Sequence, residues 1–528
     1  MDFRNERTYQ DAVEKKTVEQ FHAQYEAALS KLDQFLGLEH PLYIGGEKAT
    51  TPGRTFQDTN PANTRQVIGT FQKAGREEAA LAINAAAGAF PGWAETSPKD
   101  RAAVFLRAAD LTSQRKFLLA ALMTLENGKT RTEAVGDVDE GIDMMRFYAQ
   151  TLADEEEFDR AMGRYTTDER TRDVLKPFGV WAVVAPFNFP FAIAVGMSSG
   201  AMVTGNTVVL KPASDTPLMA LEFYRVLAKA GLPAGVLNVI TGPGGTIGEE
   251  FVSNPKVEGM VFTGSYEVGM ATFHRFSASR PRPMIAEMGG KNAAIVSEKA
   301  DLEVAAEGVM KGAFGYGGQK CSATSRVLVH EGVRADFLSK LVKITKAIRV
   351  GDPTQRNVYV GPVINDDAYQ RFQRVLPGLA KDGQVLCGGH ALREREYAHG
   401  FFLEPTIVDG LPLGHRYLRE ELFLPVLTVT TYRTFDEALR LANEVDYGLT
   451  AGIFSQDEEE VRRFFSEVQA GVVYANRRGG ATTGAVIGVQ PFGGWKGSSL
   501  TFRHAGGPYY LPQFLREQSQ TWYTSTGT

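Results

Sequence analysis

Short apolar runs alternate with helical segments along the middle of this chain, and this alternation constrains the fold more than any other feature. Strand candidates at residues 180–185, 207–210, 236–240 and 259–262 are β-branched or apolar, and a helical pattern at 218–230 separates two of them. Strands that alternate with helices favour a parallel, doubly wound α/β sheet. Such sheets bind ligands at the carboxyl ends of their strands, so functional residues are expected there.

A second alternating region begins near residue 292. Its strand and helix candidates follow one another at 293–296, 301–312, 326–329, 333–348, 424–430 and 436–445. Further helical patterns lie upstream, at 11–36, 77–89 and 101–126. A chain of 528 residues is too long for a single hydrophobic core. We therefore predict a domain over 1–289, with helices at its N-terminal end, a second domain over 290–495, and a C-terminal segment over 496–528.

Composition excludes several functional classes. The net charge is -5 and both signs are mixed along the chain, so no surface for nucleic acid is expected. No apolar run reaches the ~20 residues that a membrane helix needs, and the charged N-terminus lacks the apolar stretch of a secretory signal. Two cysteines cannot form a disulfide framework. We predict a cytoplasmic protein without a metal site.

Cys321 is the strongest candidate for a functional residue. It follows four glycines between positions 312 and 318. A lone cysteine is usually an inert core residue, but each glycine costs a helix interior about 1 kcal/mol relative to alanine. Close approach of the backbone to a ligand would explain them. Glu287, between an apolar stretch and the glycines 289–290, is a candidate base, and thiol and carboxylate together predict a covalent nucleophile with a separate general base.

Three strand ends in the first region are candidate phosphate sites. Gly244 lies in the run 241–248, which follows a strand and opens a helix, although its last glycine is one position later than G-x-G-x-x-G requires. Ser265 ends a second such turn, and Lys211 ends a third strand directly before a proline. Each alone has an ordinary interpretation, as a common turn or a solvated lysine. Together they favour a dinucleotide site.

Seven short motifs occur in the order found in the aldehyde dehydrogenase superfamily: Ala185–Pro190, Leu210–Pro212, Phe262–Ser265, Glu287–Lys291, Gly318–Cys321, Glu421–Phe423 and Pro491–Gly494. They span residues 185–494, and on them the chain resembles that superfamily. The resemblance implies a Rossmann-type NAD-binding domain, an α/β catalytic domain and a small oligomerisation flap near 158–178. It also implies that the aromatic-rich C-terminal segment pairs with a partner subunit, so a homo-oligomer built from dimers is expected.

The catalytic roles follow from the resemblance. Cys321 would attack the aldehyde carbon, and the Asn188 side-chain amide with the Cys321 backbone N–H would stabilise the oxyanion. Glu287 would activate the water that hydrolyses the thioester. Asn188 also has an alternative interpretation as a turn residue.

The same resemblance implies the contacts to the cofactor. Lys211 would bind the adenosine ribose, Ser265 the pyrophosphate, and Glu421 with Phe423 the nicotinamide ribose and ring. Ser214 stands where many NAD-preferring relatives have a glutamate that binds the ribose hydroxyls. Because that carboxylate is missing, we expect some NADP use beside NAD.

The run 479–492 resembles the substrate-carboxylate loop of superfamily members that oxidise L-glutamate γ-semialdehyde to glutamate, the second step of proline catabolism. In this chain the resemblance assigns the distal carboxylate to the Ser322 hydroxyl and to the backbone N–H groups of Gly484 and Ala485.

Phe189 and Phe492 would hold the aliphatic chain of such a substrate between them. Glu140 is the candidate counter-ion for the ammonium group, although the neighbouring aspartates of the same helix compete with it. Three alternatives stay open: a dehydrogenase of another semialdehyde acid such as succinic semialdehyde, a CoA-acylating relative, and a catalytically silent protein. Glu287 disfavours the second, because acyl transfer to CoA needs no activated water.

Overall fold

The computed structural model describes residues 3–155, 158–480 and 485–523. Its first seven-stranded sheet has the order β12-β11-β8-β9-β10-β2-β3, parallel from β12 to β10 and antiparallel at β2 and β3. The strands are β2 (Leu42–Ile44), β3 (Glu47–Ala49), β8 (Val180–Val184), β9 (Thr207–Lys211), β10 (Leu237–Val239), β11 (Val257–Thr263) and β12 (Met284–Glu287). β8 to β11 coincide with the four predicted runs, so the prediction of a parallel sheet is confirmed.

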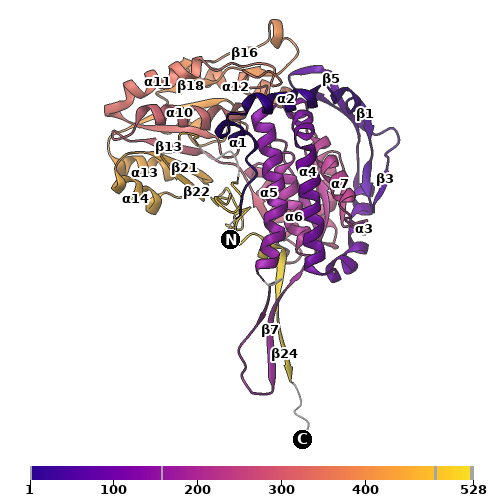
Figure 1. The fold of residues 1–528 in the computed structure, drawn as a ribbon. Helices are drawn as coiled ribbons and strands as arrows, with labels where there is room; N and C mark the ends of the chain where they lie inside the picture. Colours follow the sequence, from indigo (N-terminus) through magenta and orange to yellow (C-terminus); the bar gives the residue numbers. More distant parts are fainter. Residues whose placement is uncertain (1–2, 156–157, 481–484, 524–528) are drawn as a thin grey trace.

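Helices cover both faces of this sheet (Figure 1). The helices α4 to α7 pack with Trp181 and Val183 into one core, whereas α3, α8 and α9 pack with Ala182 and Val209 into another. Because successive side chains of a strand point to opposite faces, burial on both sides makes these strands apolar throughout. The helices are α3 (Arg76–Glu95), α4 (Pro98–Asn127), α5 (Arg131–Asp154), α6 (Ala192–Val203), α7 (Pro217–Lys229), α8 (Gly244–Ser253) and α9 (Tyr266–Phe276).

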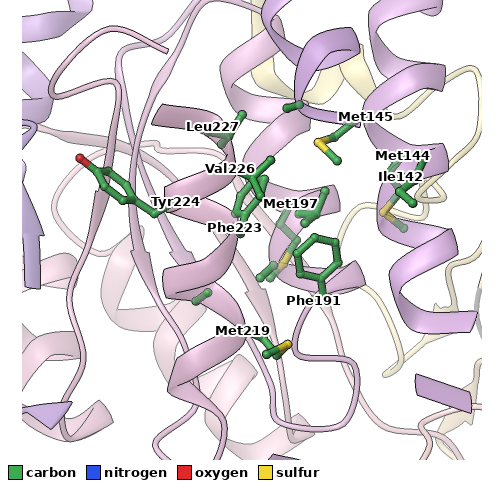
Figure 2. Close-up of a cluster of buried hydrophobic side chains, with 14 of the residues drawn as sticks. Ile142, Met144, Met145, Phe191, Met197, Met219, Phe223, Tyr224, Val226 and Leu227 are labelled. Atoms are coloured by element: carbon green, nitrogen blue, oxygen red, sulfur yellow. The ribbon is translucent and has the colours of Figure 1, made fainter. Parts of the chain in front are cut away.

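The core between α5, α6 and α7 fixes the position of two functional segments. Phe191 and Phe223 meet edge to face with ring centroids 6.2 Å apart, and Met144 of α5 lies in the same cluster (Figure 2). Gly196 of α6 makes room for Met144, since a Cβ there would lie 2.1 Å from its sulfur. α6 begins just after residues 188–189, so this packing holds them close to α5.

The second seven-stranded sheet has the order β15-β18-β19-β14-β13-β21-β22 and is parallel except at β15. Its strands are β13 (Asn292–Val296), β14 (Thr324–His330), β15 (Gln384–Cys387), β18 (Thr406–Asp409), β19 (Val426–Tyr432), β21 (Thr450–Phe454) and β22 (Val472–Ala475). Its helices are α10 (Leu302–Phe314), α11 (Arg334–Lys346), α12 (Asp366–Asp382), α13 (Phe435–Asn443) and α14 (Glu458–Glu467). The second alternating region is therefore confirmed as an α/β unit.

Smaller elements surround the two sheets. Two-stranded pairs form between β16 (Ala391–Leu392) and β17 (Phe402–Leu403), and between β20 (Tyr447–Gly448) and β23 (Trp495–Lys496). A three-stranded sheet contains β1 (Leu38–His40), β4 (Thr55–Asn60) and β5 (Asn63–Gln72). The predicted single helical segment 11–36 is wrong: the chain forms α1 (Thr8–Glu14) and α2 (Val18–Leu29), separated at Lys16, whose φ is 58°. A positive φ cannot continue a right-handed helix. None of the described helices is long and apolar enough to cross a bilayer.

A second three-stranded sheet projects from the body of the molecule (Figure 1). It joins β6 (Asp159–Ala161), β7 (Glu169–Pro177) and β24 (Leu515–Tyr523), with β24 antiparallel to β7 in the same chain. The first part of the C-terminal segment does not lie in this projecting sheet. The Met288 N–H donates to the Ser498 carbonyl (2.8 Å), and Tyr510 and Phe514 join the core of the first sheet. Residues 498–514 therefore pack against the first unit, whereas Lys496 pairs with Tyr447 in β20, and the strand after residue 514 lies in the projecting sheet.

Candidate active site

Cys321 sits on a tight turn between α10 and β14. The turn contains a 3-10 segment, Gly315–Gly318, in which Tyr316, Gly317 and Gly318 all have positive φ. A Cβ at Gly318 would lie 2.4 Å from the Leu424 carbonyl oxygen. The expectation that these glycines admit a ligand is therefore corrected at Gly318, where glycine is required by a neighbouring backbone.

Asn292 holds the Cys321 turn from behind. Its Nδ2 donates to the carbonyls of Cys321 (2.7 Å) and Ala323 (2.9 Å), and its Oδ1 accepts the Thr450 N–H (3.0 Å). Three of the four hydrogen-bonding capacities of this buried amide are thus used, and both of its donors fix the backbone of the Cys321 turn. Sequence reasoning did not identify Asn292, although it follows the Glu287–Lys291 motif directly.

Cys321 lines two different cavities. The larger, about 680 Å³, lies beside the first sheet and is lined by Asn188, Ser265, Glu421 and Phe423 among others. The smaller, about 60 Å³, is mainly apolar and is lined by Phe189, Phe492 and Glu287, with Glu140 and Ala485 also on its wall. The nucleophile, the proposed base, the two phenylalanines and the proposed ammonium counter-ion are therefore brought together.

The larger cavity suits a dinucleotide. Its volume lies within the ~300–1,000 Å³ of ordinary ligand sites. The N-terminus of α9 opens at its wall, with Ser265 as the capping residue, an arrangement that favours a phosphate. Glu421 accepts the Gly290 N–H (3.0 Å), and it fits against that turn because a Cβ at Gly289 would lie 2.2 Å from its carboxylate. Burial raises the pKa of Glu421 to about 7, while the Gly290 N–H and Lys291 act in the opposite direction.

Lys211, Ser214 and Gly244 lie together but do not line the larger cavity as the described residues define it. A Cβ on Gly244 would lie 3.8 Å from the Lys211 side chain, and the Ser214 hydroxyl donates to the Gly242 carbonyl (3.3 Å). Burial lowers the pKa of Lys211 to about 8. Its Nζ donates to the Pro212 carbonyl (2.6 Å), so it is not the solvated lysine of the alternative interpretation.

Asn188 and Glu287 approach the nucleophile from the first unit. The Asn188 Oδ1 accepts the Phe189 N–H (3.1 Å), which orients the side-chain amide and makes its Nδ2 the group for an oxyanion. Glu287 Oε1 accepts the Ser499 hydroxyl (2.9 Å), whereas Oε2 has no hydrogen-bond partner within the described part of the chain. Ser499, which sequence reasoning missed, therefore orients Glu287 and leaves its second oxygen for a proton.

Burial controls the ionisation of both reacting groups. It raises the pKa of Glu287 well above the usual range of a glutamate, while the Ser499 hydroxyl and the Gly494 N–H act in the opposite direction. It also raises the pKa of the Cys321 thiol, and the nearby Glu421 and Glu287 raise it further. Without ligands, therefore, the thiol and the carboxyl both favour their neutral forms.

The predicted substrate-carboxylate residues are only partly brought together. Gly484 lies outside the described residues. Ser322 is buried and does not line either cavity in the described part of the chain. Ala485 does line the smaller cavity, but its N–H donates to Glu140 Oε1 (3.0 Å). Burial raises the pKa of Glu140 to about 8, and the neighbouring Asp137 raises it further.

A buried ion pair supports the substrate wall. Lys129 Nζ contacts Asp137 at 2.7 Å, both side chains are fully buried, and the ammonium lies 3.5 Å from the centre of the Phe189 ring. Asp137 also accepts the Ala192 N–H (2.6 Å) at the start of α6. The pair thus fixes Phe189 through a cation–π contact and fixes the helix that follows it.

Sequence comparison identifies the family. A profile of the aldehyde dehydrogenase family matches residues 48–519. The chain belongs to that family. The 1-pyrroline-5-carboxylate dehydrogenase of Geobacillus sp. (strain WCH70) is 40% identical over 510 residues, and the 1-pyrroline-5-carboxylate dehydrogenase 1 of Halalkalibacterium halodurans is 39% identical over the same length. Each match covers 96% of this chain and 96% of the relative.

Solved structures of aldehyde dehydrogenases have the same fold. A 1-pyrroline-5-carboxylate dehydrogenase from Thermus with bound NAD is 34% identical, with a TM-score of 0.92 and 99% of each chain covered. Proline utilization A from Bdellovibrio bacteriovorus is 35% identical with a TM-score of 0.92, and this chain spans 52% of that protein. The expected family and the expected aldehyde dehydrogenase-like α/β fold are confirmed.

Proposed function

We propose that this chain oxidises L-glutamate γ-semialdehyde to L-glutamate with NAD. The observation that carries the proposal is the position of Cys321 between a dinucleotide-sized cavity and a narrow apolar cavity that ends at Glu140 and Ala485. A phenylalanine-lined passage suits the aliphatic chain of the substrate, and a carboxyl with a backbone N–H suits its two charged groups. The names of the curated relatives support the same activity.

Each step uses a residue whose surroundings are described above. Cys321 Sγ, after losing its proton, bonds to the aldehyde carbon, and Asn188 Nδ2 with the Cys321 N–H stabilises the oxyanion. NAD held in the larger cavity would accept the hydride that leaves this carbon, and the carbon would then stay bonded to Cys321 Sγ as a thioester. Glu287 then takes a proton from water as the water attacks the thioester carbon, and the Cys321 thiolate leaves.

Ser214 does not exclude NADP from the cofactor site. With a hydroxyl in place of a carboxylate, no charge at this position repels a 2′-phosphate. We therefore propose NAD as the main cofactor with some use of NADP. Ser214→Glu should lower kcat/KM with NADP more than with NAD. An equal effect on both cofactors would remove Ser214 from cofactor selection.

A substrate panel tests the function. Reduction of NAD is followed with glutamate γ-semialdehyde, succinic semialdehyde and pentanal. Losing a hydrogen bond to a charged group costs roughly 1.5–3 kcal/mol, so we expect glutamate semialdehyde to be favoured by about tenfold to hundredfold in kcat/KM. Glu140→Gln should reduce this preference, whereas Asp154→Asn, an exposed change on the same helix, should not. Equal efficiency on glutamate semialdehyde and pentanal would refute the substrate but not the family.

The assembly is also a proposal. The projecting sheet carries Trp522 and Tyr523, and the connection between β6 and β7 carries Tyr165; Tyr165, Trp522 and Tyr523 are 95%, 68% and 60% exposed in the isolated chain. Exposed aromatic residues of this kind are typical of protein interfaces. We propose a homo-oligomer in which this sheet contacts a partner subunit.

A further inference from the structure

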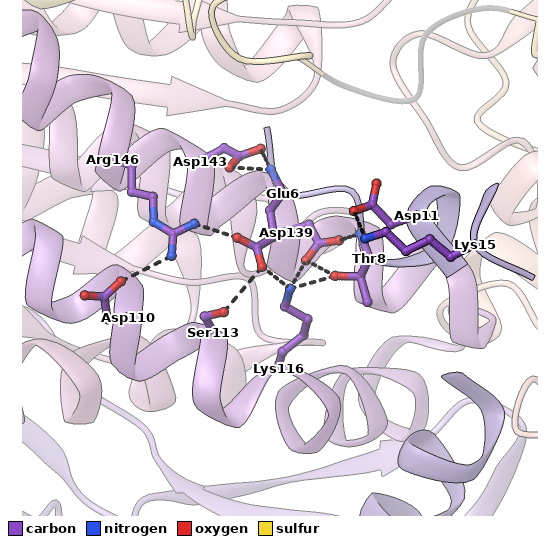
Figure 3. Close-up of polar contacts among 10 residues, drawn as sticks. All are labelled: Glu6, Thr8, Asp11, Lys15, Asp110, Ser113, Lys116, Asp139, Asp143 and Arg146. Atoms are coloured by element: carbon purple, nitrogen blue, oxygen red, sulfur yellow. Dashed lines mark hydrogen bonds and ion pairs between the residues drawn. The ribbon is translucent and has the colours of Figure 1, made fainter. Parts of the chain in front are cut away.

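The N-terminal segment (residues 3–10) lies along α5 and is bound to it by charged and polar contacts (Figure 3). The Glu6 N–H donates to both carboxylate oxygens of Asp143 (2.9 and 3.0 Å), and the Thr8 N–H and hydroxyl donate to Asp139 (3.0 and 2.9 Å). Lys116 of α4 contacts Glu6 and Thr8 at 2.6 Å each and Asp139 at 2.8 Å. These contacts place the segment beside the helix that carries Glu140.

Asn5 connects this segment to the loop that follows residue 484. Its Nδ2 donates to Asp143 Oδ2 (3.1 Å) on α5 and to the Ile487 carbonyl (2.9 Å) on the loop. Phe3 meets Phe147 of α5 edge to face at 5.3 Å. A Cβ at Gly488 of the loop would lie 2.9 Å from the Phe147 ring and 3.4 Å from the Phe3 Cβ. One amide thus joins three segments that are far apart in sequence.

A third cavity lies between these segments. Its volume is about 560 Å³, and residues 5–7, 9 and 10 of the N-terminal segment form part of its wall. Glu140, Phe189 and Ala485 line both this cavity and the apolar cavity that contains Cys321. The third cavity is therefore adjacent to the end of the substrate site where the charged groups of an amino acid would bind.

We propose that the third cavity is the entrance to the substrate site and that the N-terminal segment forms one of its walls. In this proposal Asn5 is a positioning residue, which keeps the Ala485 N–H and the Glu140 carboxyl where they can bind the charged groups of an amino-acid aldehyde. The inference rests on the proposed function. The N-terminal segment lies before residue 48, where the match to the aldehyde dehydrogenase family begins, whereas the residues that it positions lie within that match. Ile487 is two residues from Ala485, and its carbonyl is one of several backbone groups that hold this loop, beside the Val486 N–H on the Gln490 carbonyl (3.1 Å) and the Gly488 N–H on the Gly506 carbonyl (2.9 Å). Releasing it therefore loosens the backbone that presents the Ala485 N–H.

Two variants of Asn5 test the proposal. Asn5→Ala removes both hydrogen bonds and should lower kcat/KM for glutamate semialdehyde about tenfold, through KM. Inhibition by L-glutamate should weaken in parallel, whereas pentanal oxidation should change by less than about twofold, since pentanal has no charged groups. Asn5→Asp should be worse than Asn5→Ala, because its carboxylate would face the Asp143 carboxylate and the Ile487 carbonyl, which are both acceptors.

Arg4→Ala is the matched control, because Arg4 is exposed and lies in the same segment. Arg4→Ala should leave kcat/KM unchanged for both glutamate semialdehyde and pentanal. An equal loss of kcat/KM with glutamate semialdehyde and with pentanal in Asn5→Ala would overturn the proposal, since it would show a general structural role. An unchanged kcat/KM with both substrates would overturn it as well. If the unaltered protein does not prefer glutamate semialdehyde over pentanal, the proposed function fails and this inference fails with it. If the unaltered protein prefers glutamate semialdehyde and Asn5→Ala keeps that preference, only this inference fails.

Discussion

Replacing Glu287 by glutamine isolates the hydrolytic half of the reaction. Glutamine keeps the shape of the side chain, and its carbonyl oxygen can still accept the Ser499 hydroxyl at the 2.9 Å contact. The change removes proton acceptance at Oε2, the oxygen without a partner in the described part of the chain. A positioned general base contributes roughly 10²–10⁴-fold to the rate, so steady-state turnover should fall by about that factor. This corresponds to an activation free energy that is higher by about 3–5 kcal/mol.

Rapid-mixing measurements separate the two halves of the reaction. Glu287→Gln should show a burst of reduced NAD close to one equivalent of active sites, followed by slow turnover, because Cys321 still forms the thioester. Ser499→Ala is a milder companion change that loosens Glu287 without removing it. A steady-state rate for Glu287→Gln equal to that of the unaltered protein would refute the assignment of Glu287 as the base.

The pH dependence gives a second readout. Burial raises the pKa of Glu287, so the basic carboxylate appears only as the pH rises through that raised value. Thioester hydrolysis should therefore accelerate with increasing pH in the unaltered protein. In Glu287→Gln this dependence of the slow phase should vanish, while the burst rate still increases with pH because the pKa of the Cys321 thiol is also raised. A slow phase with unchanged pH dependence would assign the ionisation to another group.

Three further predictions follow from the same geometry. Cys321→Ala should abolish aldehyde oxidation and retain NAD binding measured by calorimetry, whereas Cys387→Ala, at the end of β15, should keep full activity; residual oxidation in the first variant would exclude Cys321 as nucleophile. Binding of L-glutamate at pH 7 should release protons, because the pKa of Glu140 is about 8 in the free site and an ammonium lowers it; identical binding enthalpies in buffers of different ionisation enthalpy would contradict this. Sedimentation should show a species larger than 57.7 kDa that Trp522→Glu dissociates, and a monomer alone would refute the assembly.

The strands could be predicted, and the candidate catalytic residues could be selected, because their signals are local. A β-branched run such as 207–210 is apolar on both faces, and the structure buries it on both faces. The glycines before Cys321 were interpreted as sites of close approach to a ligand; the structure has a turn there, and at Gly318 the reason is packing against the Leu424 carbonyl. The break at Lys16 was missed because the residues around it fit a helical pattern, whereas the chain closes α1 there with a local turn in which the Thr17 N–H donates to the Ala12 carbonyl (2.7 Å).

The parts of the site that could not be predicted depend on contacts between distant segments. Ser499 reaches Glu287 across 212 positions, and the Ala485 N–H reaches Glu140 across 345. Neither donor has a distinctive sequence neighbourhood, since pairs of serines and backbone N–H groups occur everywhere. Their role appears only when the C-terminal segment returns to the first sheet and the loop after residue 484 reaches α5.

The contact between Glu140 and Ala485 explains why a substrate with both charges should be preferred. In the free protein the Ala485 N–H donates to the Glu140 carboxyl, whose raised pKa keeps it largely protonated near neutral pH. A carboxylate that takes the Ala485 N–H must displace Glu140, which would then be left buried without a partner. An ammonium on the same substrate supplies that partner and lowers the pKa of Glu140, so the internal pair is exchanged for two intermolecular pairs. Succinic semialdehyde has only the carboxylate, so it displaces Glu140 without forming the compensating ion pair. A site that bound only the carboxylate would not distinguish the two substrates, whereas this exchange does.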